Sequence, residues 1–219
     1  MLRAMRNRLL GIIVVATSVA VLAGQSKPPS DIHPESLSRL PPLQRDSLDA
    51  EGKRVWDVLA GGRGMPVTGP APVSIYSPGS AEPIQLLNRY LRNTVVGPRY
   101  FELSALLAAR DFDQQYEWSG HEPAALRAGV EQSVIDVIKF NRPVTGLSEK
   151  DATVIRLGRA LLRDHKVSSE LWAKTVDLFG RQGAIEIVAT IGDYVMAGMM
   201  LTAVDQQLTP NLKPLLPPR

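Results

Sequence analysis

The sequence predicts an all-α fold, and two observations carry that prediction. Apolar residues recur at helical spacing along most of the chain, as they do at Leu103, Leu106 and Leu107. No window alternates apolar and polar residues between turn signals, so no sheet is expected. The chain has 219 residues, 44% of them hydrophobic, which is enough for one domain with a substantial core.

The first half of the predicted domain holds two helices separated by a long loop. One helix is expected from Ser47 to the Gly61-Gly62 pair, where two adjacent glycines favour an end. Residues 61–80 contain five glycines and four prolines, a density that predicts a loop without helix. The next helix is expected to begin with Ser80 as its cap and Pro83 in its first turn.

The sequence of the second half of the domain predicts six further helical segments. They are expected at 99–110, 114–128, 131–140, 148–165, 168–179 and 182–206. Ser148, followed three residues later by Asp151, resembles a capping box. The mostly apolar stretch 185–204 contains Glu186 and Asp193, which are costly inside a bilayer. We therefore expect a core or subunit-interface helix there and not a membrane span.

The two ends of the chain have compositions unlike the middle. Residues 1–24 place three arginines before a short uncharged apolar run, the pattern of a signal peptide or an N-terminal anchor. This predicts export, to the periplasm or beyond, with membrane contact only if the leader is not cleaved. A polar, proline-rich linker is expected at 25–43, the helical domain at 44–206 and an irregular proline-rich tail at 207–219.

Composition excludes several classes of function. The chain has no cysteine, which removes disulfides, thiolate metal sites and thiol redox chemistry. The formal net charge of +3 equals the three arginines of the leader, so the remaining chain is balanced. No nucleic-acid partner is expected from such a charge distribution.

The segment 101–129 contains the side chains that can carry acid–base chemistry. Glu117 and His121 are four residues apart on a predicted helix and therefore share one face, which continues into small alanines at 124, 125 and 128. Glu102 on the preceding helix can approach this pair if the two helices pack antiparallel. A histidine beside carboxylates is a proton donor or acceptor that works near neutral pH.

Other readings of these residues stay open at this point. A Glu–His pair at this spacing also occurs as an ordinary surface ion pair. Tyr116 and Trp118, which flank Glu117, are candidates for substrate binding but also suit a core or an interface. Arg110 is a candidate for binding a substrate carboxylate. No metal site is expected, because helical di-metal sites use a Glu-x-x-His motif twice.

These residues resemble the signature of the carboxymuconolactone decarboxylase family, within the all-helical alkyl hydroperoxidase D-like superfamily. The resemblance rests on Glu102, Ala108-Ala109-Arg110, Tyr116-Glu117-Trp118, His121 and Gly129, and extends over about 44–206. In the redox branch of the superfamily, two cysteines lie between the Glu and the His. Gln114 and Glu117 stand at those positions here, so this chain resembles the cysteine-free branch and not the thiol peroxidases.

The resemblance implies a cofactor-free lyase with His121 as general acid–base, assisted by Glu117 and Glu102. It also implies a homotrimer or homohexamer with pockets near subunit contacts. The expected substrate is a small carboxylated lactone or an unsaturated acid. Two alternatives are an exported oligomeric protein that binds small acids without turnover, and a lactone hydrolase or isomerase that uses the same acid–base pair.

Overall fold

The computed structural model describes residues 29–217, and within that range the protein is helical. It contains eight α-helices and no strand, with a single isolated bridge between His33 and Ser38. The all-α prediction is therefore confirmed for this part of the chain. The expected leader at 1–24, the start of the linker at 25–28 and the last two residues of the tail lie outside the described residues.

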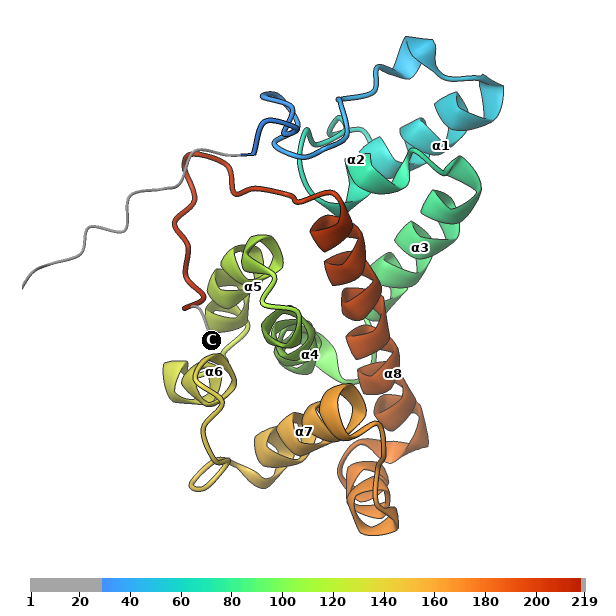
Figure 1. Ribbon diagram of the computed structural model, residues 1–219. Coiled ribbons are helices and arrows are strands. Elements are labelled where there is room, and N and C mark those ends of the chain that lie inside the picture. Colours follow the sequence, from blue (N-terminus) through green and yellow to red (C-terminus); the bar gives the residue numbers. More distant parts are fainter. Residues whose placement is uncertain (1–28, 218–219) are drawn as a thin grey trace, which may run out of the picture.

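The helices follow one another with short connections (Figure 1). Their bounds are α1 Ala50–Ala60, α2 Pro70–Ser74, α3 Pro78–Leu91, α4 Gly97–Asp111, α5 Gln115–Arg127, α6 Gln132–Lys139, α7 Glu149–Arg159 and α8 Ser169–Ala203. A 3-10 turn at Arg45–Ser47 precedes α1, and a π-helical turn at Ala160–Asp164 extends α7. Gly180, with φ of 70°, interrupts α8, so the two helices expected at 168–179 and 182–206 meet at a kink.

Helix α4 is the centre of the molecule. Every residue from Phe101 to Arg110 is buried, and the helix contacts α5, α6, α7 and α8, which surround it in Figure 1. A helix buried on all sides lies within a core and not on its surface. The residues that α4 carries are therefore fixed by packing from several directions.

The structure corrects the prediction for 61–80. This segment contains α2 at Pro70–Ser74, and α3 begins at Pro78, before the expected cap at Ser80. Both helices start with proline in the first turn, where the N–H that proline lacks has no intrahelical partner in any case. Proline density therefore did not prevent helix formation here. Pro83 lies inside α3 and not in its first turn.

Helix α8 meets the length and composition criteria for a membrane span, but half of its most apolar stretch is buried. It packs against α2, α3, α4 and α7. The two acids of its apolar stretch 185–204 are partnered: Glu186 accepts hydrogen bonds from Tyr90 and Gln182, and Asp193 accepts one from Asn88. These contacts are those of a helix in a protein core.

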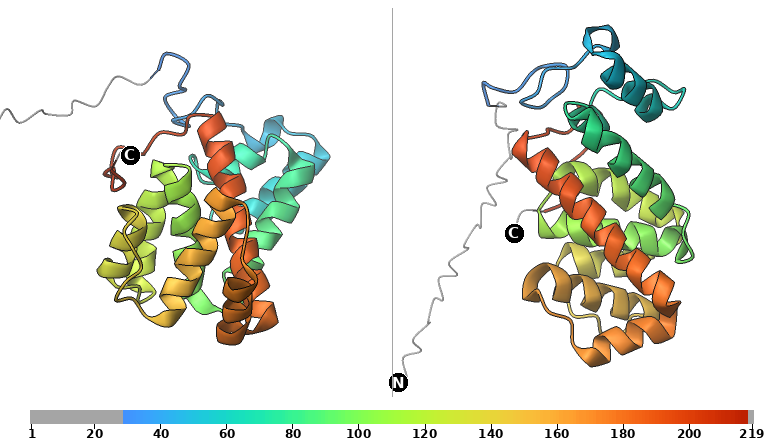
Figure 2. Two further views of the ribbon diagram at one scale, coloured as in Figure 1. Left: turned by 60° about the horizontal axis from the view of Figure 1, so that its bottom comes forward. Right: turned by 90° about the vertical axis from the view of Figure 1, so that its right-hand side faces the viewer.

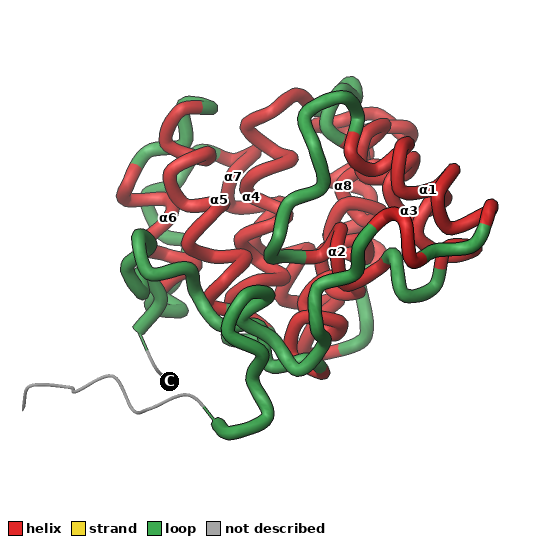
Figure 3. The backbone as a smooth tube through the Cα atoms, turned by 90° about the horizontal axis from the view of Figure 1, so that it is seen from above, coloured by secondary structure: helices red, strands yellow, loops and turns green. Residues whose placement is uncertain are grey.

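The segment before α1 lies beside the end of α8 and the start of the tail, as the left view of Figure 2 shows. The backbone N–H of Arg39 donates to Val204 O, and that of Gln207 donates to Leu37 O. Helices α1 to α3 group together on one side of the bundle, as the view in Figure 3 shows. Their contact with α8 through α2 and α3 encloses the pocket described next.

Candidate active site

The hairpin of α4 and α5 brings Glu102, Glu117 and His121 together. His121 Nδ1 lies 2.6 Å from Glu102 Oε2, and His121 Nε2 lies 3.4 Å from Glu117 Oε2. Helix α5 begins after Gln114, whose side chain accepts a hydrogen bond from the Tyr116 N–H. This start places Glu117 and His121 on one face of α5, turned toward α4. The structure thus places all three side chains in contact.

The imidazole of His121 is largely buried, and its surroundings favour the protonated form. Burial alone lowers the pKa of His121, but hydrogen bonds and charge from Glu102 and Glu117 outweigh it and raise the pKa from 6.5 to about 9. The three side chains are only 6 to 12% exposed. This pKa favours an imidazolium between the two carboxyl groups at neutral pH, open to a ligand only on the side that faces the pocket.

One oxygen of this cluster is uncommitted. Glu117 Oε1 is buried and has no hydrogen-bond partner among the described residues. A buried carboxylate oxygen without a donor is costly, because it has given up water without compensation. Glu117 Oε1 is therefore an unsatisfied acceptor beside the imidazole.

Glu117 and His121 face a pocket of about 430 Å³. Its walls come from 63–70, α2, α3, α5 and α8, so the segment that was expected to be a structureless loop forms one side. Glu102 is not part of the lining and contacts His121 from behind. The pocket therefore exposes one acid–base pair to a ligand, with a second acid supporting the imidazole from the core.

The wall opposite α5 is polar and was not predicted as part of the site. It contains Asn88 of α3, Arg92 directly after that helix, and Asp193 and Tyr194 of α8. The ring of Tyr194 packs edge-on against His121, with 4.7 Å between ring centroids. Burial raises the pKa of Asp193 and of Tyr194, so both groups favour their protonated forms more than usual. The one feature of the sequence that could have indicated this wall is the four-residue spacing of Asn88 and Arg92, which places the two side chains on the same side of the chain.

Of the three predicted substrate-binding residues, only Tyr116 lines this pocket. Its hydroxyl lies 2.9 Å from Thr68 Oγ1, which links α5 to the segment before α2. The backbone at Gly69 passes close to the same ring. Tyr116 therefore forms a side wall of the pocket.

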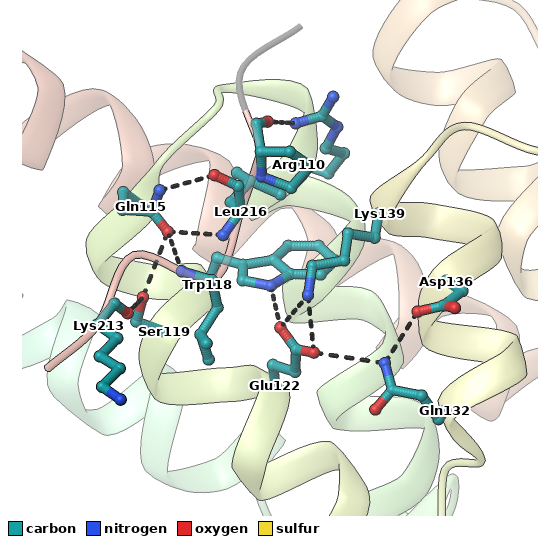
Figure 4. Close-up of polar contacts among 12 residues, drawn as sticks. Arg110, Gln115, Trp118, Ser119, Glu122, Gln132, Asp136, Lys139, Lys213 and Leu216 are labelled. Atoms are coloured by element: carbon teal, nitrogen blue, oxygen red, sulfur yellow. Dashed lines mark hydrogen bonds and ion pairs between the residues drawn. The ribbon is translucent and has the colours of Figure 1, made fainter. Parts of the chain in front are cut away.

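Trp118 and Arg110 lie elsewhere (Figure 4). Trp118 is fully buried in the core and donates its indole N–H to Glu122, which also pairs with Lys139 at 2.9 Å. Arg110 pairs with Asp113 and donates to Pro217 O in the tail. Neither side chain lines the pocket, so we do not retain either as a substrate-binding candidate.

The alanines that follow His121 on α5 also lie outside the lining. Ala124, Ala125 and Ala128 come later along the helix, beyond the part of α5 that the pocket reaches. The small residues that do make room are Gly120 on α5, Ala71 on α2 and Ala197 on α8. The space beside the imidazole is thus created between elements and not along one helix.

Comparison of the chain with models of protein families found no match, and a search of curated proteins found none either.

Proposed function

We propose that this protein is a cofactor-free lyase of the carboxymuconolactone decarboxylase type, acting on a small carboxylated lactone or unsaturated acid. The observation that carries the proposal is the imidazolium of His121, held between two buried carboxylates and facing a pocket of about 430 Å³. An alkyl hydroperoxidase D-like fold, assembly into a homotrimer or homohexamer, and export belong to the same proposal.

The reaction needs a proton at carbon and no separate electron acceptor. The bond between the leaving carboxylate and its neighbouring carbon breaks, CO2 departs, and the electron pair is delocalised into the conjugated carbonyl of the substrate. His121 then donates a proton to carbon and is reprotonated from solvent. Overall, the substrate loses one carboxylate group as CO2 and gains one proton at the carbon that carried it.

Each member of the cluster has a distinct part in this proposal. His121 is the general acid, since its raised pKa keeps it protonated at neutral pH. Glu117 faces the substrate beside it and places a negative charge near the leaving carboxylate, which favours loss of that charge as CO2. Glu102 does not touch the substrate and is a positioning residue for the imidazole. Tyr116 contacts the substrate from the side wall.

Double-bond isomerisation is the second candidate, favoured by the presence of both Glu117 and His121 in the pocket lining. A carboxylate that lines the pocket can remove a proton from one carbon, and the adjacent imidazolium can deliver a proton to another. Such a reaction conserves the number of carbon atoms, whereas decarboxylation removes one.

The test is incubation of the purified protein with a panel of unsaturated lactone acids, with products followed by mass spectrometry. Loss of CO2 supports the lyase, an isomer of unchanged mass supports the isomerase, and addition of water identifies a hydrolase. Binding of the acids without any product identifies the non-catalytic alternative.

Variants of the two pocket-facing residues assign the chemistry to this site. His121→Asn and Glu117→Gln are expected to lower kcat by about 10²- to 10⁴-fold, the usual contribution of general acid–base catalysis. His165→Asn is the matched control, because His165 is exposed and lies outside the pocket lining. Turnover at the parent rate by the His121 variant would exclude the proposed mechanism.

A further inference from the structure

The pocket contains an arginine whose position is fixed by uncharged groups. Arg92, the residue directly after α3, lines the wall that this helix forms. Its Nε donates to Asn88 Oδ1 at 2.9 Å and its Nη2 donates to the Tyr194 hydroxyl at 3.0 Å. The guanidinium lies over the ring of Phe101, 4.8 Å from the ring centroid. Contacts with two helices besides its own therefore hold this side chain in place.

Unlike most well-fixed arginines, Arg92 has no acidic partner among the described residues. Arg159 has none either, but it donates to the backbone carbonyls of Val137 and Arg142 and lies outside the pocket lining. Arg54 and Arg99 each pair with two carboxylates, and Arg45 and Arg110 also have acidic partners. No carboxylate of the described residues lies within 4.0 Å of the Arg92 guanidinium. The nearest acid on this wall, Asp193, is bonded to the other end of the Asn88 side chain. The amide thus stands between the two charges.

A guanidinium that is held at a pocket wall and has no carboxylate partner is suited to binding one. Arginine has five N–H donors, and three of those on Arg92 are in neither of its two hydrogen bonds. Paired N–H groups bind a carboxylate through both of its oxygens, and such charged bonds are stronger than neutral ones. Since the residue is already held in place, little side-chain entropy is lost on binding.

The guanidinium is also close to the proposed acid. Arg92 and His121 both contact Tyr194 and both lie beside Phe101, whose ring centroid is 6.4 Å from that of His121. A small molecule a few atoms long can therefore reach from one cation to the other. This arrangement suits a substrate with a carboxylate at one end and its reacting carbon at the other.

We infer that Arg92 binds a carboxylate that the substrate keeps through the reaction, and that it thereby selects acids for this pocket. The inference rests on the proposed function in taking this pocket as the substrate site. It names the substrate class more closely: an acid whose retained carboxylate is separate from the group that leaves. It also gives Arg92 the role that the sequence had assigned to Arg110.

The inference is tested by binding of an unreactive probe, so that turnover is not needed. The probes are crotonate and its uncharged amide, crotonamide, titrated into the full protein by calorimetry or NMR. The parent protein is expected to bind crotonate about 10- to 100-fold more tightly than crotonamide, the range for hydrogen bonds to charged groups. Arg92→Gln is expected to remove that preference by weakening crotonate alone, and Arg92→Lys to restore part of it.

The matched control is Arg89→Gln, one turn earlier on α3. Arg89 is outside the pocket lining and donates to Val58 O, so its loss is expected to leave both affinities unchanged. Equal weakening of both probes by Arg92→Gln, or no weakening at all, would overturn the inference. Arg63 also lines the pocket. The inference would therefore also be overturned if Arg63→Gln removed the preference for crotonate over crotonamide and Arg92→Gln kept it.

The outcomes separate this inference from the proposed function. Arg92-dependent binding of crotonate with no product from any lactone acid supports the inference and contradicts the lyase. Decarboxylation with the same KM in the parent and in Arg92→Gln supports the lyase and contradicts the inference. If both hold, Arg92→Gln raises KM by about 10- to 100-fold and changes kcat far less.

Discussion

His121 Nδ1 and Glu102 Oε2 lie 2.6 Å apart, yet only His121 lines the pocket. The carboxylate of Glu102 comes from α4, the most buried helix, and contacts the imidazole from the side away from the ligand. This contact fixes one ring nitrogen toward the core and leaves Nε2 toward Glu117 and the pocket. The orientation of the proposed acid is therefore set by the core of the protein.

Glu102→Gln is expected to lower the pKa of His121. The carboxylate of Glu102 is the first of the groups that oppose the effect of burial, and its replacement by a neutral amide removes a charge in direct contact. The pKa should fall from about 9 by roughly one to two pH units, as expected for loss of an opposite charge at this distance. An NMR titration of the His121 ring measures it.

Glu149→Gln is the control, because Glu149 is exposed and pairs with Lys174 far from the imidazole in sequence. It should leave the titration of His121 unchanged. An unchanged pKa of His121 in Glu102→Gln would mean that the charge of Glu102 does not stabilise the protonated imidazole.

The free energy of unfolding should depend on pH through His121. The folded-state pKa of about 9 is above the ordinary 6.5, so the folded protein binds the proton more tightly than the unfolded chain does. This contribution is fully present below pH 6.5 and is lost as the pH rises through about 9. Its size is on the order of 3 kcal/mol. Denaturant unfolding of the parent and of His121→Asn between these pH values measures the difference.

In that comparison, the stability of the parent should fall toward that of the variant as the pH rises. The other titrating groups, including Asp193, are present in both proteins and largely cancel in the difference. Curves that stay parallel over this range would show that His121 is not protonated in the folded state.

Gly69→Ala is expected to destabilise the protein and to deform the pocket. Gly69 has φ of 97°, and an added Cβ would lie 2.7 Å from the Tyr116 hydroxyl oxygen. The substitution therefore combines backbone strain with displacement of a ring that is bonded to Thr68. We expect a loss of about 2 to 4 kcal/mol in the free energy of unfolding and weaker binding of crotonate.

Gly64→Ala is its matched control. Gly64 has φ of 87°, but nothing lies within 4 Å of an added Cβ, so only the backbone term applies. We expect a loss of about 1 to 2 kcal/mol and unchanged crotonate binding. Equal effects of the two substitutions would mean that Tyr116 is not held against Gly69.

The sequence predicted the part of the site that two neighbouring helices build. Glu117 and His121 share a face because they are four residues apart, and the short connection at 112–114 returns α5 along α4 to Glu102. Trp118 follows Glu117 directly, and one residue rotates a helical position by about 100°, which turns the indole into the core. Sequence adjacency to a site residue was therefore a poor guide.

The opposite wall depends on contacts that local patterns do not encode. Arg92 and Asp193 are far apart in the sequence, and only the packing of α3 against α8 brings them to one pocket. Helical periodicity predicts which face of each helix is buried, but it does not predict which other helix packs against that face. The short helix α2 was not predicted for a different reason: a high density of prolines was taken to exclude a helix, although both prolines of α2 lie in its first turn.

Leu216→Ala is expected to destabilise the protein, although the tail has no helix. Leu216 is only 5% exposed and packs with the main core. The Gln115 side chain accepts the N–H groups of Leu215 and Leu216 and donates to Leu216 O, which holds the tail on α5 (Figure 4). Truncating a buried leucine removes packing that the backbone bonds do not replace, so the expected loss is about 2 to 4 kcal/mol.

Leu212→Ala is the comparison within the same tail, because Leu212 is 37% exposed and loses less apolar burial. Its substitution should cost less than about 1 kcal/mol in the same denaturant experiment. Similar small losses for both leucines would show that the tail is not packed on the core in solution. A large loss confined to Leu216→Ala assigns the end of the chain to the folded domain, where it stabilises the helix that carries Glu117 and His121.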